Sequence, residues 1–181
     1  MAEIDALSQL RDIESAVFRH ALPLPLQADA RPAWQGTGFQ VGGLRLVAAM
    51  GEVGEVLKLP KVAPLPGVKS WVVGVANVRG RLIPVIDLHD FLGLRPTQPN
   101  SQWRVLVVED RELVAGLLVE QSLGIQHFLE ETFGEVPADA PESLAPYLRG
   151  AFRHGGRIYY DLELPSILRD EKFRDVAHGV N

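Results

Sequence analysis

The hydrophobic pattern of the chain changes character near residue 33. Before that point, apolar residues recur every three or four positions: Ile4, Leu7, Leu10, Ile13, Val17 and Phe18. This spacing predicts an amphipathic helix over about residues 5–21, followed by a proline-rich linker that begins at Pro23. After residue 33, apolar runs are short and are separated by glycine and proline, which is typical of β-strands joined by turns.

This change divides the chain into three parts. We expect an N-terminal helical extension with its linker over residues 1–33, a β-rich domain over 34–175 and a short tail over 176–181. Two roles stay open for the predicted helix: it packs on its own domain, or its apolar face binds a partner.

The clearest β-signal lies between Gly74 and Gly93. Two runs rich in valine and isoleucine bracket the tripeptide Arg79-Gly80-Arg81, which predicts a hairpin of residues 71–78 and 82–88 with two guanidinium groups at its tip. Asp87 is positioned to cap a helical turn that follows the second strand. Pro84 has no backbone donor, so we expect it at a sheet edge or a bulge.

Further strands are predicted on either side of this hairpin. Before the hairpin we expect strands at residues 39–41 and 44–49, on either side of a Gly-Gly turn, and at residues 53–59. After it we expect strands at residues 104–109 and 113–119, on either side of Asp110-Arg111. The last predicted strand, residues 157–164, precedes a helix that begins at Pro165. The acidic segment 130–142 is predicted as a loop. Many short strands with regular turns favour small β-barrels.

The second half of the sequence repeats the pattern of the first. Residues 80–88 align without gaps on residues 156–164, and residues 46–50 align on 115–119. This predicts two packed copies of one barrel unit. Where a polar residue occurs in one copy alone, the fold does not require it: Arg79 aligns with Gly155. Such residues are candidates for a site, although drift at solvent positions explains any one of them equally well.

Composition and charge exclude several classes of function. The net charge is −5 and the chain has no cysteine, so we expect neither a disulfide nor a thiolate metal site, and a reducing compartment such as the cytoplasm. No signal peptide and no membrane insertion are expected. The five histidines are scattered, and no P-loop or nucleophile elbow occurs. We therefore expect no catalytic residue, no cofactor and no metal.

One alternative function is a β-barrel module that binds single-stranded nucleic acid. Small barrels bind nucleic acid with basic grooves and exposed aromatic rings. The net charge of −5 and the aromatic content of 7% weigh against this alternative, and nucleic acid is not expected as a partner.

Several motifs together resemble the CheW-like domain family. They are Gly74-Val-Ala-Asn-Val-Arg-Gly80 leading to Pro84-Val-Ile-Asp-Leu88, Val53-Gly-Glu-Val56 before Pro66-Gly67, and Val114-Ala-Gly-Leu-Leu-Val-Glu120. The resemblance covers about residues 36–168. It implies a mainly β fold of two SH3-like five-stranded β-barrel subdomains without catalysis. The chain departs from the family pattern at Ser122 and Gly124.

The resemblance implies a cytoplasmic adaptor in bacterial signal transduction. Such adaptors couple the cytoplasmic tip of a chemoreceptor, a methyl-accepting protein, to the regulatory domain of a CheA-type histidine kinase. The groove between the barrels takes the receptor helix, and barrel ends pair with the kinase. The N-terminal helix, residues 34–39 and residues 50–56 are similar to the PilI-like branch, which serves type IV pilus twitching motility.

Residues and resemblance together give seven candidate partner-binding positions: Val53, Glu55, Gly74, Val75, Asn77, Arg79 and Gly80. Val53 and Val75 are expected to line a groove for an amphipathic helix. Arg79 is expected to anchor a partner, because its planar fork can form two hydrogen bonds with a carboxylate. The competing prediction is that Arg79 pairs internally, with Glu55 or with Asp87.

Overall fold

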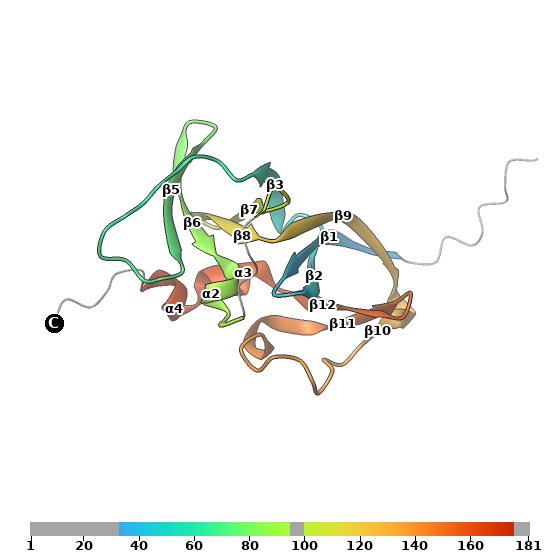
Figure 1. Cartoon of the computed structure of the whole chain (residues 1–181). Helices are drawn as coiled ribbons and strands as arrows, with labels where there is room; N and C mark the ends of the chain where they lie inside the picture. Colours follow the sequence, from blue (N-terminus) through green and yellow to red (C-terminus); the bar gives the residue numbers. More distant parts are fainter. Residues whose placement is uncertain (1–32, 95–99, 176–181) are drawn as a thin grey trace, which may run out of the picture. The chain divides into compact units, whose positions relative to one another are not determined.

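The computed structural model describes residues 33–94 and 100–175 of the 181-residue chain. The predicted N-terminal helix, its linker and the tail over residues 176–181 therefore lie outside the described residues. Strands dominate the described part (Figure 1), which confirms the mainly β fold. None of its helices is long and apolar enough to cross a membrane.

The strands follow one another mostly as hairpins. They are β1 (Ala33–Val41), β2 (Leu44–Ala49), β3 (Val53–Lys58), β4 (Val62–Ala63), β5 (Val72–Val78), β6 (Arg81–Asp87), β7 (Arg104–Asp110), β8 (Leu113–Val119), β9 (Gln121–Leu129), β10 (Phe133–Gly134), β11 (Leu148–His154) and β12 (Arg157–Leu162). The short helices are α2 (Leu88–Phe91), η1 (Glu130–Thr132), η2 (Ala145–Tyr147), α3 (Leu164–Arg169) and α4 (Glu171–Arg174).

Hydrogen bonding arranges these strands into two sheets. Sheet A has the order β10-β11-β12-β2-β1-β9, and sheet B has the order β4-β5-β6-β8-β7-β3. Each sheet therefore holds five longer strands and one strand of two residues. Each also has one parallel pair at its centre, β12 with β2 and β6 with β8, while its other pairs are antiparallel.

The two sheets are built alike, but neither is made of one sequence repeat alone. Strands β1–β6 correspond in order to β7–β12, yet sheet A combines β1 and β2 with β9–β12, and sheet B combines β3–β6 with β7 and β8. The repeats therefore exchange a hairpin, so that each sheet contains strands from both halves of the sequence. The two sheets also share a register irregularity at equivalent positions. The pairing of β3 with β7 shifts by one residue between Val53 and Glu55, and the pairing of β9 with β1 shifts between Ser122 and Gly124.

The main hydrophobic core lies between the sheets. Its buried residues include Phe39 and Leu46 from sheet A, Ile86 and Leu117 from sheet B, and Ile167 from α3. Smaller clusters lie inside each sheet: Val47, Phe128, Phe152 and Tyr159 in sheet A, and Ala76, Val85, Trp103, Val105 and Leu118 in sheet B. Because apolar burial is the main favourable term in folding, this shared core holds the sheets as one body.

The predicted central hairpin is confirmed as β5 and β6, and Asp87 caps α2 by accepting hydrogen bonds from the backbone of His89 and Asp90. Pro84 was predicted at a sheet edge or a bulge, and the prediction of a sheet edge was wrong. It lies on β6, which is an interior strand between β8 and β5. The pairing with β8 begins only at Val85, so a residue without an N–H group is tolerated just outside that ladder.

Candidate functional site

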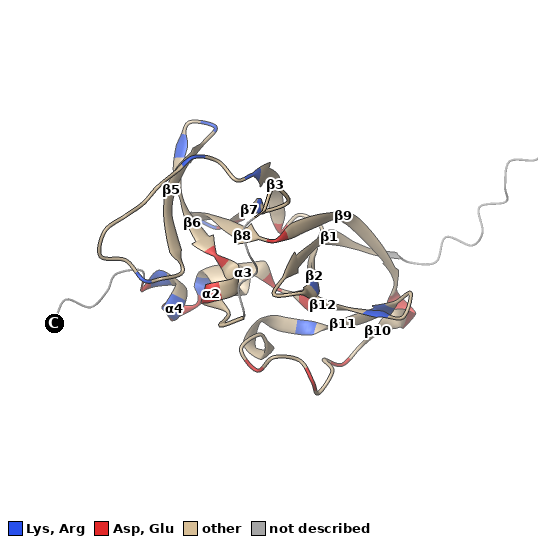
Figure 2. Cartoon of the chain, viewed as in Figure 1, with Lys and Arg blue, Asp and Glu red and all other residues tan. Residues whose placement is uncertain are grey.

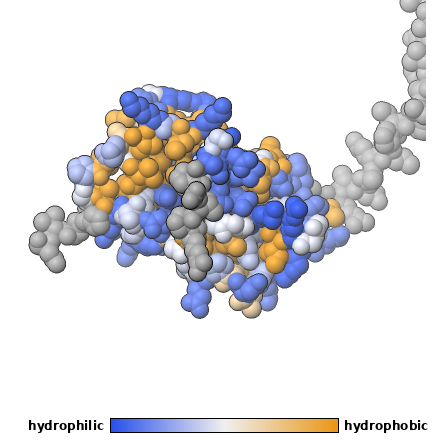
Figure 3. All heavy atoms as spheres, in the orientation of Figure 1, coloured by the Kyte–Doolittle hydropathy of each residue, from blue (hydrophilic) through white to orange (hydrophobic). Residues whose placement is uncertain are grey.

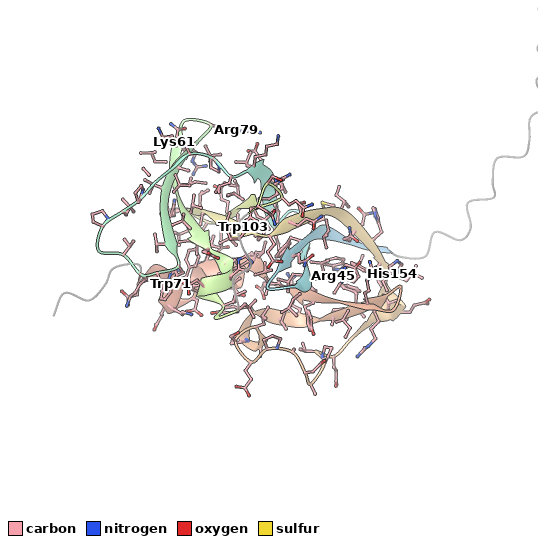
Figure 4. The ribbon with its side chains drawn as sticks, in the orientation of Figure 1. Arg45, Lys61, Trp71, Arg79, Trp103 and His154 are labelled. Atoms are coloured by element: carbon pink, nitrogen blue, oxygen red, sulfur yellow. The ribbon has the colours of Figure 1, made fainter. Side chains whose placement is uncertain are left out.

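The turn between β5 and β6 presents Arg79 at the tip of a hairpin (Figure 4). Arg79 and Gly80 have φ angles of 51° and 83°, as a two-residue type I′ turn requires. The Asn77 side chain accepts a hydrogen bond of 2.8 Å from the Gly80 N–H and so stabilises the turn. The Arg79 side chain is 78% exposed, and the hairpin therefore displays its charge to solvent.

An ion pair joins this turn to the far edge of sheet B. Arg79 Nη2 lies 2.7 Å from Glu55 Oε1 on β3. Strands β3 and β5 have three strands between them in the hydrogen-bonded order, so the contact shows that sheet B curls until β3 approaches the turn. The internal pairing predicted for Arg79 is confirmed with Glu55 and not with Asp87, although most of the Arg79 side chain stays exposed.

The space beside this ion pair is a depression of about 200 Å³. Its described lining consists of an apolar floor and a charged rim: Gly54, Glu55, Val78, Arg79, Arg81, Ile83, Val107, Glu109 and Val114. On the rim, Arg81 Nη1 lies 3.7 Å from Glu109 Oε2. Figure 2 shows the positive charge gathered on the β5–β6 hairpin. An apolar floor inside a rim of both charges suits recognition of another protein.

Exposed apolar side chains also occur on the strands and loops of sheet B. Leu82 is 74% exposed, Leu59 45%, Leu65 42% and Val56 39%. Figure 3 shows hydrophobic surface over β5 and the segment before it, beneath a hydrophilic rim. Because monomeric proteins seldom leave large contiguous apolar patches exposed, this surface is a candidate for contact with a partner.

Two of the predicted site residues have structural counterparts in sheet A. Gly74 is buried, and a Cβ atom there would lie 2.1 Å from the Ala63 carbonyl oxygen of β4. Its counterpart Gly150 has the same relation to β10, with the Gly134 carbonyl oxygen 2.7 Å from an added Cβ. Gly80 likewise corresponds to Gly156, which also has a positive φ. In both sheets, glycine therefore allows a close approach to a neighbouring strand at the first position and a tight turn at the second.

The structure places Val53 and Val75 in different settings. Val53 is partly buried and packs against the core between the sheets. Val75 is also partly buried, on β5, where it pairs with Ala63 on one side and Pro84 on the other. The structure thus brings Glu55 and Arg79 into contact, while the groove predicted for Val53 and Val75 stays a prediction.

A buried charge cluster was missed by the sequence analysis. His89 of α2 is fully buried, with Nδ1 3.0 Å from Asp87 Oδ1 and Nε2 3.1 Å from Glu120 Oε1. The imidazole stacks on Trp103 with 5.4 Å between ring centroids. The Gly43 N–H, in the β1–β2 turn of sheet A, donates to Glu120 Oε2 at 3.4 Å. The cluster therefore connects the end of β6 with a turn of the other sheet.

The environment of this cluster shifts two pKa values in opposite directions. Burial alone would lower the pKa of His89, but the hydrogen bonds and charges of Asp87 and then Glu120 outweigh it and raise that pKa above 6.5. Burial alone would raise the pKa of Asp87, but His89 holds it below 3.8. Because both ring nitrogens face carboxylates and the ring is shielded from solvent, this histidine has a structural role.

Comparison with known proteins identifies related chains. Residues 35–172 match the CheW-like domain family. Over 178 residues the chain is 43% identical to Protein PilI of Pseudomonas aeruginosa, covering 98% of this chain and 99% of PilI. It is 30% identical to the chemotaxis protein CheW of Bacillus subtilis, covering 74% of this chain and 85% of that protein.

A solved structure shares the fold. The crystal structure of the scaffolding protein TtCheW from Thermoanaerobacter tengcongensis superposes with a TM-score of 0.68 at 20% identity, covering 78% of this chain and 96% of that one.

Proposed function

The chain belongs to the CheW-like domain family, and from that premise we propose that it is a non-catalytic cytoplasmic adaptor. Its partners are the cytoplasmic tip of a chemoreceptor and the regulatory domain of a CheA-type histidine kinase. The nearly full-length match to PilI supports a role in chemotaxis-like control of type IV pilus twitching motility.

The observation that carries this proposal is the β5–β6 end of sheet B. Charged side chains from β3, the turn and β7 ring an apolar floor there, and exposed apolar residues continue the surface. The Arg79 turn has a counterpart in sheet A that holds only glycines, Gly155 and Gly156. A charged group that the shared architecture does not require supports the proposal that this turn recognises a partner.

The two sheets suit an adaptor because they share one core. Apolar burial between them fixes their relative position, so two partners bound to this body are held at a fixed distance and angle. On sheet B, the apolar floor supplies affinity, while Arg79 and Glu55 supply orientation through charge-assisted hydrogen bonds. The receptor helix is proposed to lie along the groove that includes Val53 and Val75.

The proposal is tested by assembly of the three proteins from one genome. The full chain is mixed with the purified kinase regulatory domain and receptor cytoplasmic fragment, and sedimentation velocity is recorded for each pair and for the mixture. We expect a complex containing all three, and none between kinase domain and receptor alone under the same conditions. Failure of the chain to bind either protein, together with salt-sensitive binding of a single-stranded oligonucleotide, would favour the nucleic-acid alternative.

A further inference from the structure

Sheet A contains a cavity that differs in chemistry from the depression on sheet B. Its volume is about 390 Å³, within the range of small-molecule sites. The described residues that line it come from five elements: Trp34, Glu130, Phe133, Phe152 and Asp161. Three aromatic rings and two carboxylates thus face one space, which is an unusual lining for the inside of a small sheet.

The three rings stand at angles to one another around this space. The Trp34 and Phe152 ring centroids are 4.6 Å apart at 41°, and those of Phe133 and Phe152 are 4.9 Å apart at 53°. Phe133 is 44% exposed, although a ring of this size gains by burial. An aromatic ring that presents its face to this space attracts a cation through the negative face of the π-system.

One oxygen of the buried carboxylate in this lining has no hydrogen-bonded partner among the described residues. Asp161 is 3% exposed, and its Oδ1 is buried without a hydrogen bond to any described residue. The nearest cation is Arg149, whose Nε lies 3.6 Å from that oxygen and whose Nη2 bonds Glu52. The pKa of Asp161 is raised to about 6, mainly by burial and also by the charges of Glu52 and Glu163, which together outweigh the lowering effect of Arg149.

The fold does not require this carboxylate, because sheet B does without it. Asp161 pairs with Val47 in the parallel β12–β2 ladder, and Val85 holds the same place in the β6–β8 ladder, opposite Gly116. In sheet B, Val85 packs in a closed apolar cluster with Ala76 and partly buried side chains. A buried, incompletely paired carboxylate costs stability, and a bound cation would compensate for that cost. The position of Asp161 beside three aromatic rings is therefore consistent with a ligand site.

We propose that this cavity binds an organic cation that carries a guanidinium group. The planar head lies against the rings of Trp34 and Phe133 and donates hydrogen bonds to Asp161 and Glu130. The volume leaves room for an aliphatic stem beyond the head. This chemistry occurs in a free alkylguanidine and in an arginine side chain of another protein, and the two sources are separated by experiment.

The probe for the first source is agmatine, and that for the second is a blocked pentapeptide with one central arginine between glycines. Each is titrated into the full chain by isothermal titration calorimetry, with pentanol as a neutral control. We expect at least one guanidinium probe to bind and pentanol to bind far more weakly. Preference for agmatine identifies a small-molecule site, and preference for the peptide identifies an arginine-bearing partner. Absence of binding by both probes overturns the proposal.

Substitutions locate the binding. Asp161→Asn keeps the shape and is expected to weaken binding about tenfold, the loss of one charge-assisted hydrogen bond. Glu130→Gln and Phe133→Leu alter exposed residues, so they keep the test valid if Asp161→Asn does not fold, and each is expected to weaken binding about threefold. Glu135→Gln, at an exposed carboxylate outside the cavity lining, is the matched control.

Binding near pH 6 should also release protons, because a bound cation lowers the pKa of Asp161. Unchanged affinity in all three cavity variants, or equal loss in Glu135→Gln, would contradict the proposal. Neither the kinase nor the receptor is present in this assay, so its outcome is independent of the adaptor function.

Discussion

The β5–β6 turn of sheet B and the β11–β12 turn of sheet A share one backbone conformation but differ in their side chains. The first residue is Arg79 in one and Gly155 in the other, with φ angles of 51° and 57°. A left-handed conformation costs a residue with a side chain roughly 1–2 kcal/mol, whereas glycine adopts it freely. Glycine therefore satisfies the turn, so the fold does not require an arginine there. Arg79 pairs with Glu55 within the chain, and its side chain remains 78% exposed and available to the partner proposed above.

The places where a strand leads into a helix show a second contrast. Asp87 and Glu163 stand at equivalent helix N-caps, before α2 and α3. Beside α2, a fully buried histidine lies between two carboxylates. Beside α3, Arg149 of β11 contacts Glu52 and Asp161 and remains partly exposed. The surroundings of α2 thus depend on an imidazole that can lose its charge, and those of α3 on a guanidinium that stays charged.

The largest effect on stability is expected from His89→Leu. The substitution leaves Asp87 and Glu120 facing each other without a cation, and breaking a buried ion pair in this way costs about 3–5 kcal/mol. The free energy of unfolding is measured by urea denaturation at pH 6. His154→Leu, at the exposed last residue of β11, should change it by less than about 0.5 kcal/mol. Similar losses in both variants would refute the structural role of the cluster.

A smaller loss is expected when alanine replaces the glycines under β4 and β10. Gly74→Ala and Gly150→Ala each place a Cβ against a backbone carbonyl, and overpacking of this kind costs about 1–3 kcal/mol. Gly74→Ala should be the more severe, because its φ of 145° also disfavours a side chain. Gly54→Ala is the control, since the nearest atom to its added Cβ is 3.6 Å away. Thermal unfolding compares the three, and an unchanged midpoint for Gly74→Ala would remove its assigned role.

The smallest expected effect on stability is a pH dependence that arises from the buried histidine. The pKa of His89 is raised on folding, so its contribution is fully present below pH 6.5 and is lost as pH rises through the folded pKa. The pKa of Asp87 is lowered, so its contribution is present above pH 3.8 and is lost as pH falls through the folded pKa. The stability difference between the unmodified chain and His89→Leu should therefore be greatest between these values. A difference that grows above pH 7 would contradict the assignment.

Local features of the fold were predictable from the sequence. The β5–β6 and β7–β8 hairpins, the Asp87 cap and the helix after β12 follow from short apolar runs, turn residues and caps that act over a few positions. Strands β9 and β11 were not predicted, because Gly124 and the polar residues of β9 interrupt its alternation and because β11 is short of β-branched residues. The exchange of hairpins between sheets depends on contacts between distant segments, which periodicity does not encode.

For the candidate site, too, local features were predictable from the sequence and contacts between distant segments were not. The position of Arg79 followed from the turn, and its pairing with Glu55 was one of two internal alternatives. The charges of Arg81 and Glu109 joined the same rim only through the curl of sheet B. The contact between His89 and Glu120 could not be predicted from the sequence, because the two residues lie on segments far apart in the chain and meet only where the sheets join.

The most direct test of the central claim compares two arginines at equivalent ends of the sheets. Arg79→Ala removes the exposed guanidinium of sheet B, and Arg157→Ala removes one beside the turn of sheet A. Both should change the free energy of unfolding by no more than roughly 1 kcal/mol, because they affect exposed charges. Binding to the kinase regulatory domain and to the receptor tip is then measured by calorimetry. We expect Arg79→Ala to weaken binding to at least one of them about tenfold, while Arg157→Ala stays within about twofold. Equal affinities for the two variants would contradict a recognition role for the β5–β6 turn.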